Sequence, residues 1–178
     1  MKNSSDALAA IAAAIRNVPD FPKPGIQFKD ITPVLAQADL FASSIELLAA
    51  NFQPGAIDTV VGIDARGFIF AAGVALKLQC GFVPVRKKGK LPWHTMEVSY
   101  DLEYGSNTIA IHRDAVKPGA RVLLIDDVLA TGGTAAAAAA LLKKAGGDIR
   151  EIGFVIELGF LKGRDKLPGL PVRSLVAF

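Results

Sequence analysis

One segment constrains the fold of this chain more than any other. It runs Val122-Leu123-Leu124-Ile125-Asp126-Asp127-Val128-Leu129-Ala130-Thr131-Gly132-Gly133-Thr134, and an alanine run follows it. The apolar start is typical of a buried strand, and the alanines have the highest helix propensity of any residue. The glycines and threonines between them predict a short loop. The segment therefore predicts one strand–loop–helix unit of an α/β fold.

The rest of the chain continues this alternation. Apolar periodicity and flanking Gly and Pro residues predict helices over 4–17, 38–52, 67–79 and 134–145. Short apolar runs predict strands over 57–63, 81–86, 121–125 and 149–157. Strands that alternate with helices in units of this length indicate a mostly parallel, twisted sheet flanked by helices on both faces.

Two segments interrupt the alternation. Residues 18–25 contain three prolines within six positions, which forbids a regular helix and predicts an extended, stiff segment that packs on the body of the protein through neighbouring apolar residues. Residues 88–107 lack helical periodicity, and Met96, Val98 and Tyr100 alternate with polar residues. This alternation predicts a hairpin or ribbon, here called the hood.

Composition excludes several classes of protein. The 178 residues suffice for one domain, and 51% apolar with 21% charged residues is typical of a globular protein with a core. A net charge of +3 is too small to indicate nucleic-acid binding. The lone Cys80 forms no intramolecular disulfide, and no apolar run reaches the ~18 residues of a membrane span. We therefore expect a cytoplasmic protein that binds neither nucleic acid nor membrane.

The first segment also predicts chemistry. Ligands of open α/β sheets bind beyond the carboxyl ends of the strands, where Asp126 and Asp127 lie. The loop 131–134 at the start of a helix offers main-chain N–H groups and two hydroxyls, which suit a phosphate. Two carboxylates would repel that anion unless they accept hydrogen bonds from a sugar diol. A phosphorylated ribose satisfies both halves of the segment.

Alternatives remain for single features. The segment lacks the glycine pattern of a nucleotide-triphosphate P-loop and of a dinucleotide fold. The acid pair alone could cap a helix, and the glycine pair alone could form a turn. Arg66 could form a structural ion pair. The cluster Arg86-Lys87-Lys88-Gly89-Lys90 is either a solvated loop or a site for an anion.

The segment 122–134 resembles the phosphoribosyl pyrophosphate (PRPP) signature of the purine phosphoribosyltransferase family. Further stretches resemble the adenine-specific branch of that family, and the match covers about residues 19–166. These stretches are 19–26, 28–33, 62–68, 85–92, 100–105, 157–158 and 162–164. The resemblance implies the type I phosphoribosyltransferase fold in a single domain, 1–178. The N-terminal segment 1–34 would contribute to the base pocket, and the hood would span about 88–107.

The resemblance also implies an activity. Adenine and PRPP would give AMP and pyrophosphate, a step of purine salvage, with Mg²⁺ held mainly through substrate and water. A homodimer is implied as well. Two alternatives stay open: a 6-oxopurine (hypoxanthine, guanine or xanthine) as the base, and a PRPP-sensing regulator. The 6-oxopurine enzymes usually place a lysine near the base, and Val155-Ile156-Glu157-Leu158 has none.

Roles follow from the resemblance for matching positions. The residues that would hold the ribose 5-phosphate are Asp126, Asp127, Ala130, Thr131, Gly132, Gly133 and Thr134. Those that would meet the pyrophosphate are Ala65, Arg66, Lys29, Arg86, Lys87 and Lys90. Those that would contact the base are Ile26, Gln27, Arg66, Leu158 and Tyr104. Glu103 on the hood would accept the proton that adenine loses, and Arg66 is the second predicted catalytic residue.

Some positions depart from the family pattern. Lys29 stands where arginine is frequent and loses the bidentate fork of a guanidinium. Gln27 stands where a small apolar residue is common, and Trp93-His94 stands where glycine is usual. These differences bear on base selectivity and on the motion of the hood. Lys162-Gly163-Arg164 is expected to form only a surface turn.

Overall fold

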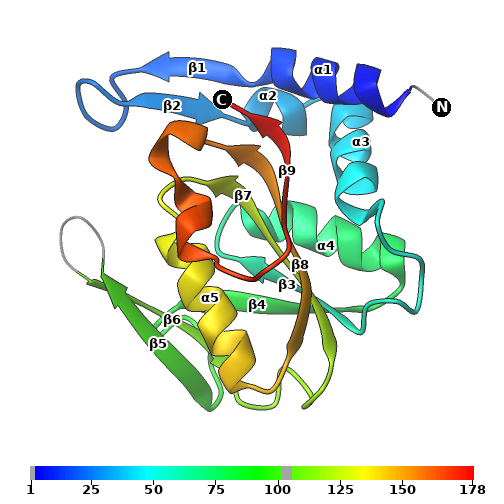
Figure 1. The fold of residues 1–178 in the computed structure, drawn as a ribbon, viewed down its shortest axis with the longest axis vertical. Coiled ribbons are helices and arrows are strands. Elements are labelled where there is room, and N and C mark those ends of the chain that lie inside the picture. The colour runs from blue at the N-terminus through cyan, green and yellow to red at the C-terminus, as the bar shows by residue number, and fades with distance from the viewer. Residues whose placement is uncertain (1–2, 102–105) are drawn as a thin grey trace.

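A mixed sheet of seven strands organises the protein, in the order β5-β6-β4-β3-β7-β8-β9 (Figure 1). The computed structural model describes residues 3–101 and 106–178. The strands β3 (Thr59–Ile63), β4 (Gly81–Lys87), β7 (Arg121–Leu129), β8 (Asp148–Glu157) and β9 (Val172–Ala177) run parallel to one another. Strands β5 (Thr95–Asp101) and β6 (Ser106–His112) extend one edge in antiparallel pairing. The predicted α/β class with a mostly parallel sheet is confirmed.

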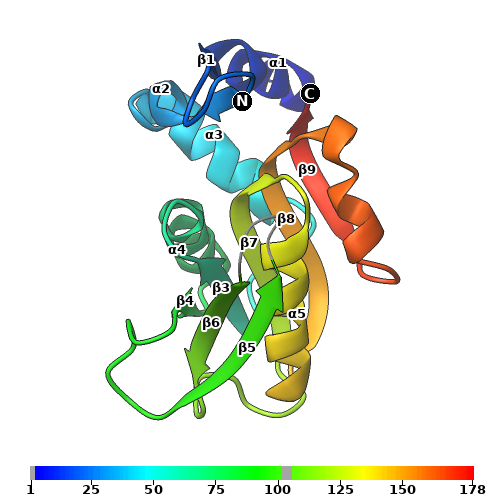
Figure 2. The same ribbon diagram turned by 90° about the vertical axis from the view of Figure 1, so that its left-hand side faces the viewer.

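Helices cover both faces of the sheet (Figure 2). Helices α3 (Ala38–Ala49) and α4 (Gly67–Leu78) lie on one face, with α1 (Ser4–Ala14) and the single turn α2 (Thr32–Leu35) beside α3, and α5 (Gly133–Lys144) covers the other face. Successive side chains of β7 pack on opposite faces of the sheet. Leu123 and Ile125 pack with the α3–α4 layer, and Val122 and Leu124 pack with α5. Burial of both faces explains why this strand reads as a continuous apolar run.

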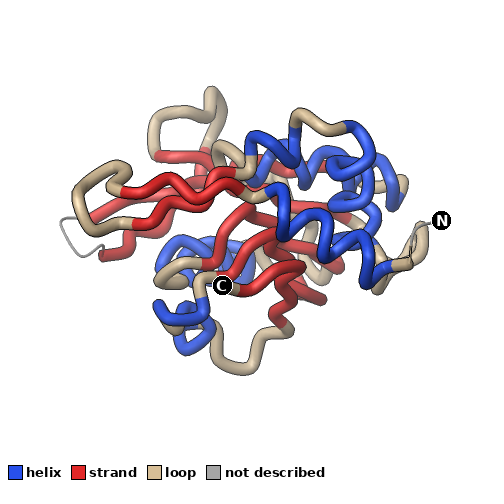
Figure 3. Tube along the Cα trace, turned by 90° about the horizontal axis from the view of Figure 1, so that it is seen from above, coloured by secondary structure: helices blue, strands red, loops and turns tan. Residues whose placement is uncertain are grey.

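The Pro-rich segment forms a small hairpin above the carboxyl ends of the sheet strands (Figures 1 and 3). Its strands β1 (Arg16–Pro19) and β2 (Gln27–Asp30) pair antiparallel. The predicted first helix was too long at its end, because residues 16–19 pair with β2 instead of continuing α1. The hairpin packs against the body, as expected, and brings residues 26–29 to a cavity described below.

The sequence did not predict the single turn α2, strand β9 or the two 3-10 turns η1 (Gly159–Leu161) and η2 (Gly163–Lys166). The hood contains the predicted ribbon, made of β5 and β6, but β6 continues to His112. Glu103 and Tyr104 lie outside the described residues. None of the helices in the described ranges is long and apolar enough to cross a membrane.

Candidate active site

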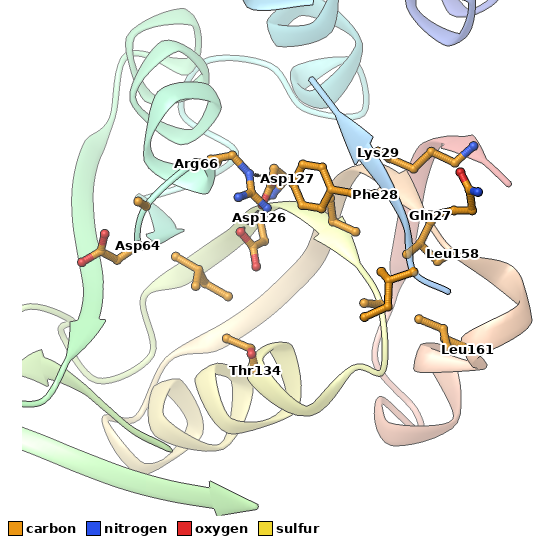
Figure 4. A pocket seen from close by; sticks show the side chains of 15 residues that line it. Gln27, Phe28, Lys29, Asp64, Arg66, Asp126, Asp127, Thr134, Leu158 and Leu161 are labelled. Atoms are coloured by element: carbon orange, nitrogen blue, oxygen red, sulfur yellow. Dashed lines mark hydrogen bonds and ion pairs between the residues drawn. The ribbon is translucent and has the colours of Figure 1, made fainter. Parts of the chain in front are cut away.

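A cavity of about 430 Å³ opens at the carboxyl end of the parallel strands, between β7, the turn after β3 and the N-terminal hairpin (Figure 4). Side chains from distant parts of the chain meet there. Its lining residues are Ile26, Gln27, Phe28, Lys29, Ile63, Asp64, Ala65, Arg66, Asp126, Asp127, Val128, Ala130, Thr134, Leu158 and Leu161. This is the place where ligands of open α/β sheets bind.

A smaller hollow of about 70 Å³ adjoins the cavity at the start of α5. The loop of residues 130–134 lines it, and Asp126, Val128, Ala130 and Thr134 line both spaces. Within the described chain no side chain caps α5, whose cap residue Gly132 has a φ of 78°. The main-chain N–H groups of the first helical turn therefore lack the cap that a Ser or Asp usually supplies, and with the helix dipole they favour an anion.

The loop 130–134 packs against the start of η2. A Cβ added at Gly132 would lie 2.2 Å from the carbonyl oxygen of Gly163, and one added at Gly163 would lie 2.2 Å from that of Ala130. Gly163 is buried, so residues 162–164 are more than the surface turn expected from the sequence. The main chains approach this closely because both positions lack a side chain.

Asp126 and Asp127 form the polar centre of the cavity. Asp127 is buried, accepts a hydrogen bond from Arg66 Nε, and its own N–H donates to Asp126 Oδ1 at 2.9 Å. Burial of the Asp126 carboxyl, together with the negative charge of Asp127, raises the pKa of Asp126 well above its usual range. Hydroxyl groups of a bound ligand would stabilise the charged form, so the pair suits a diol.

Apolar side chains form the end of the cavity nearest the hairpin. Ile26 and Phe28 come from the hairpin, and Leu158 and Leu161 come from the segment after β8. The Phe28 ring lies edge-on to Phe21, with 5.1 Å between the ring centroids. The two walls leave a slot that suits a flat apolar ring.

A bidentate ion pair fixes the wall after β8. Arg164 donates from Nε and Nη2 to the two carboxylate oxygens of Glu157, each at 2.7 Å, and from Nη1 to the Val172 carbonyl at 2.9 Å. Ser174 donates to the same carboxylate at 2.7 Å. These bonds lower the pKa of Glu157, the Arg164 contact most of all. They hold η1 and η2, and with them Leu158 and Leu161, against the sheet.

Basic groups lie on the opposite side of the acid pair. The turn Ala65-Arg66 follows β3 through a cis peptide bond, and the Arg66 guanidinium carbon lies 5.6 Å from the centre of the Phe28 ring. Arg86 donates from Nε to Asp64, a lining residue, at 3.0 Å and from Nη1 to the Lys90 carbonyl at 3.0 Å. The predicted cluster thus begins at the cavity rim, although Arg86, Lys87 and Lys90 do not line the cavity themselves.

The structure therefore brings most of the predicted residues together. Those that line the two spaces are Ile26, Gln27, Lys29, Ala65, Arg66, Asp126, Asp127, Ala130, Thr131, Gly132, Gly133, Thr134 and Leu158. Lys29 contributes its stem, but its ammonium points away from the acid pair (Figure 4), donates to Asn17 at 2.6 Å and lies 3.6 Å from the Phe178 ring centre. The roles of Glu103 and Tyr104, outside the described residues, stay predictions.

The described residues of the site suit a metal ion only if the substrate supplies most of its ligands. Among the described residues, no group of three or more His, Cys, Asp or Glu side chains is arranged to hold a metal. Mg²⁺ commonly keeps several waters and binds through one or two carboxylates together with substrate phosphates. The Asp126–Asp127 pair can supply that share of a coordination shell, and no more.

Comparisons with known proteins show the family. The family model described as "Phosphoribosyl transferase domain" matches residues 30–166. The chain belongs to the phosphoribosyltransferase family. The match spans the acid pair, the loop 130–134 and the basic turn, the features that the geometry brought together. It begins only at residue 30, after the hairpin residues that line the apolar slot.

Individual relatives of this phosphoribosyltransferase carry a more specific name. This chain is 55% identical over 168 residues to the adenine phosphoribosyltransferase of Roseiflexus sp., and the match covers 94% of this chain and 98% of the relative. A crystal structure of adenine phosphoribosyltransferase from Rhodothermus marinus is 53% identical, with a TM-score of 0.93 and coverage of 98% and 99%. The Saccharomyces cerevisiae enzyme, complexed with an imino-altritol bisphosphate and adenine, is 40% identical, with a TM-score of 0.91 and coverage of 96% and 99%.

Sequence reasoning missed several lining residues of this phosphoribosyltransferase. They are Phe28, Ile63, Asp64, Val128 and Leu161. Phe28 carried a signal, since it is an aromatic residue beside the predicted base-contacting pair. Leu161 carried none, because its place depends on the η1 turn and on the Arg164–Glu157 contact that closes the segment around it.

Proposed function

We propose that this phosphoribosyltransferase transfers the ribose 5-phosphate group of PRPP to adenine and so forms AMP and pyrophosphate in purine salvage. One observation carries the proposal. An anion-binding hollow, an acid pair and an apolar slot follow one another in two adjoining spaces that share Asp126, Val128, Ala130 and Thr134. The phosphate, diol and base of AMP follow one another in the same order.

Each part of the substrates has a partner. The 5′-phosphate accepts hydrogen bonds from the loop 130–134, and the ribose diol donates to Asp126 and Asp127. The adenine ring lies between the Ile26–Phe28 wall and the Leu158–Leu161 wall. Pyrophosphate lies near Ala65 and Arg66, and near Arg86 at the rim of the cavity. Such placement aligns the base behind the anomeric carbon, which converts a bimolecular collision into a positioned attack.

The chemical step exchanges one bond for another at C1′. The bond from C1′ to the pyrophosphate oxygen breaks, and the leaving group takes both electrons. The purine nitrogen donates its pair to C1′ from the opposite face, which inverts the configuration, and then loses its proton. Positive charge that develops on the ribose is favoured by the two carboxylates. Glu103 remains our proposed acceptor of the proton.

Phosphoribosyltransferases generally use Mg²⁺ with PRPP, and we propose the same here. Asp126 and Asp127 would contact the ion directly or through water, and pyrophosphate and ribose hydroxyls would complete its shell. When bound, Mg²⁺ neutralises charge on the departing pyrophosphate. The protein residues orient the substrates and exclude water from the cavity.

Adenine is favoured over a 6-oxopurine by two observations. The relatives with more than half of their residues identical are named adenine phosphoribosyltransferases. The segment after β8 presents Leu158 and Leu161 to the cavity, and no lysine from that segment lines it. A PRPP-sensing regulator is disfavoured because the match to these enzymes spans nearly the whole chain.

A base panel tests the proposal. The purified protein is mixed with PRPP, Mg²⁺ and adenine, hypoxanthine, guanine or xanthine, and pyrophosphate release is measured. We expect release with adenine far above that with the other bases. The Asp127→Asn variant, prepared in parallel, controls for a contaminating host enzyme. No turnover of adenine by the wild-type protein would refute the proposal, and a preference for hypoxanthine or guanine would move it to the 6-oxopurine branch.

We also propose a homodimer that uses the outer face of α4. Leu76 is 82% exposed, Ile69 lies on the same helical face, and Phe82 packs edge-on to Phe68 beside them. An exposed apolar cluster of this kind is typical of a protein interface. Sedimentation of the wild-type protein and of Leu76→Glu tests this assignment: a dimer that the substitution dissociates supports it, and a wild-type monomer contradicts it.

The remaining assignments follow the same account. We propose a single domain over residues 1–178, in which the segment 1–34 completes the base pocket and the hood, about 88–107, covers the site. A cytoplasmic location remains a prediction from the single cysteine. No nucleic acid or membrane is needed for the proposed reaction.

A further inference from the structure

A hydrogen bond connects the hood to the anion-binding hollow. The hydroxyl of Tyr100, on strand β5, lies 3.0 Å from Oγ1 of Thr134, in the first turn of α5. The Tyr100 ring is partly buried and packs on the core cluster that contains the buried face of α5. The contact joins residues 34 positions apart, and Thr134 lines both the large cavity and the adjoining hollow.

An anion in the hollow would fix the direction of this bond. Each hydroxyl carries one hydrogen, and either oxygen can be the donor in this bond. A phosphate dianion only accepts hydrogen bonds. When Tyr100 donates to Thr134, the hydrogen of Thr134 is left to point into the hollow, and the two hydroxyls form a chain that ends on the ligand. Such chains strengthen each member through mutual polarisation.

We infer that Tyr100 is a positioning residue for the 5′-phosphate: its hydroxyl donates to Thr134 and aims the Thr134 hydroxyl at the phosphate. The inference rests on the proposed function for the identity of the ligand. Tyr100 acts through Thr134 and has no part in bond breaking at C1′. Its contribution is therefore to affinity for phosphorylated ligands, and ligands without the phosphate do not benefit from it.

The hydroxyl of Tyr100 is not required to hold the ribbon together. Strand β5 pairs with β6 along its length, from Thr95 opposite His112 to Asp101 opposite Ser106. A second hydroxyl pair on the same strand provides a matched comparison: Ser99 Oγ lies 2.8 Å from Thr108 Oγ1. Because successive side chains of a strand point to opposite faces, this exposed pair faces away from α5. Its loss removes a similar bond without touching the hollow.

Ligand binding to four variants tests the inference. Dissociation constants for AMP, adenosine, ribose 5-phosphate and ribose are measured for wild type, Tyr100→Phe, Thr134→Val and the double variant, with Ser99→Ala as the control. The phenylalanine retains the packed ring, and circular dichroism of each variant verifies its fold. We expect Tyr100→Phe to weaken AMP and ribose 5-phosphate by about 3- to 10-fold, the range for one net hydrogen bond. Adenosine binding and the Ser99→Ala control should remain at wild-type values.

The double variant separates positioning from packing. If Tyr100 acts through Thr134, adding Tyr100→Phe to Thr134→Val costs no further affinity. An equal loss for AMP and adenosine, or full additivity of the two substitutions, would overturn the inference. The inference and the proposed function can fail separately. If Tyr100→Phe weakens ribose 5-phosphate binding as predicted but the wild-type protein does not turn over adenine, the inference is upheld and the proposed function is refuted.

Discussion

Arg66 donates a hydrogen bond through Nε to the carboxylate of Asp127, and this contact joins the turn after β3 to the end of β7. The contact neutralises a buried carboxylate that lies next to a second acid. The Arg66 side chain is about half exposed, with 47% of its surface accessible, so it can leave Asp127 without a large structural change. A substrate diol can then replace the guanidinium at the carboxylate.

Removing either partner should destabilise the free protein, because a buried carboxylate or its hydrogen-bond donor loses its counterpart. We expect Arg66→Ala and Asp127→Asn each to lower the free energy of unfolding by roughly 1 to 2 kcal/mol, less than for a fully buried pair. The double variant should lose no more free energy of unfolding than the less destabilising of the two single substitutions. Urea unfolding without ligand measures this, and Lys77→Ala, which breaks the exposed pair with Glu46, serves as a control with little effect. Independent, additive losses would contradict the coupling.

Asp126 should give the opposite result. Its folded-state pKa is raised by burial and by Asp127, so its ionisation opposes folding. The penalty is absent below the unfolded pKa of about 3.9 and complete above the raised folded pKa. Asp126→Asn should therefore be more stable than wild type by about 1 kcal/mol at pH 7.5, with a smaller gain at pH 4.5, and should bind AMP more weakly. A variant less stable than wild type at both pH values would show that the carboxylate is not under strain in the fold.

The close approach of Gly132 and Gly163 predicts a sharp response to one methyl group. Gly163→Ala places a Cβ against the Ala130 carbonyl and the neighbouring loop atoms, which must move. We expect a loss of about 1 to 3 kcal/mol in stability and a higher KM for PRPP, because the displaced loop holds the phosphate. Gly81→Ala is the matched control, since a Cβ there meets no atom within 4 Å. If Gly163→Ala behaved like this control, the turn would not support the loop.

The Arg164–Glu157 pair predicts a pH-dependent contribution to stability. The pKa of Glu157 is lowered, mainly by Arg164, so the pair stabilises the fold above the unfolded pKa of about 4.3 and the stabilisation is lost as pH falls through the folded pKa. Arg164→Met should cost about 1 kcal/mol at pH 7, a modest value because Arg164 is half exposed, and should flatten the loss of stability between pH 5 and pH 3.

The same variant should raise the KM for adenine, because the Leu158–Leu161 wall loses its anchor. Arg150→Met, which breaks an exposed pair with Asp148, controls for the change in charge. An acid profile identical to that of wild type would exclude Glu157 as the responsible group.

The sequence predicted those parts of the molecule that depend on local pattern. Strand β7, the loop 130–134 and helix α5 follow one another within a few residues, so apolar runs, glycines and alanines identify them directly. The basic turn after β3 was expected at the site from the family resemblance; it meets the acid pair because β3 and β7 are parallel neighbours whose carboxyl ends share one edge of the sheet.

The rest depends on contacts between distant residues. Strand β9 mixes Arg173 and Ser174 with apolar residues, and it is a strand because it pairs with β8. The contacts of Gly132 with Gly163, and of Tyr100 with Thr134, likewise join segments that no local pattern connects. Lys29 was expected at the pyrophosphate, and this role stays a prediction; its ammonium donates to Asn17 and lies over the Phe178 ring, contacts that no local pattern indicates.

A crystal structure of the protein with AMP tests the central claim most directly. The account predicts the phosphate on the main-chain N–H groups of residues 131–134, the ribose diol on Asp126 and Asp127, and the adenine ring between Phe28 and Leu158. A phosphate bound instead beside Arg86 and Lys90 at the rim of the cavity, or a ribose that leaves both carboxylates without a hydroxyl partner, would contradict it.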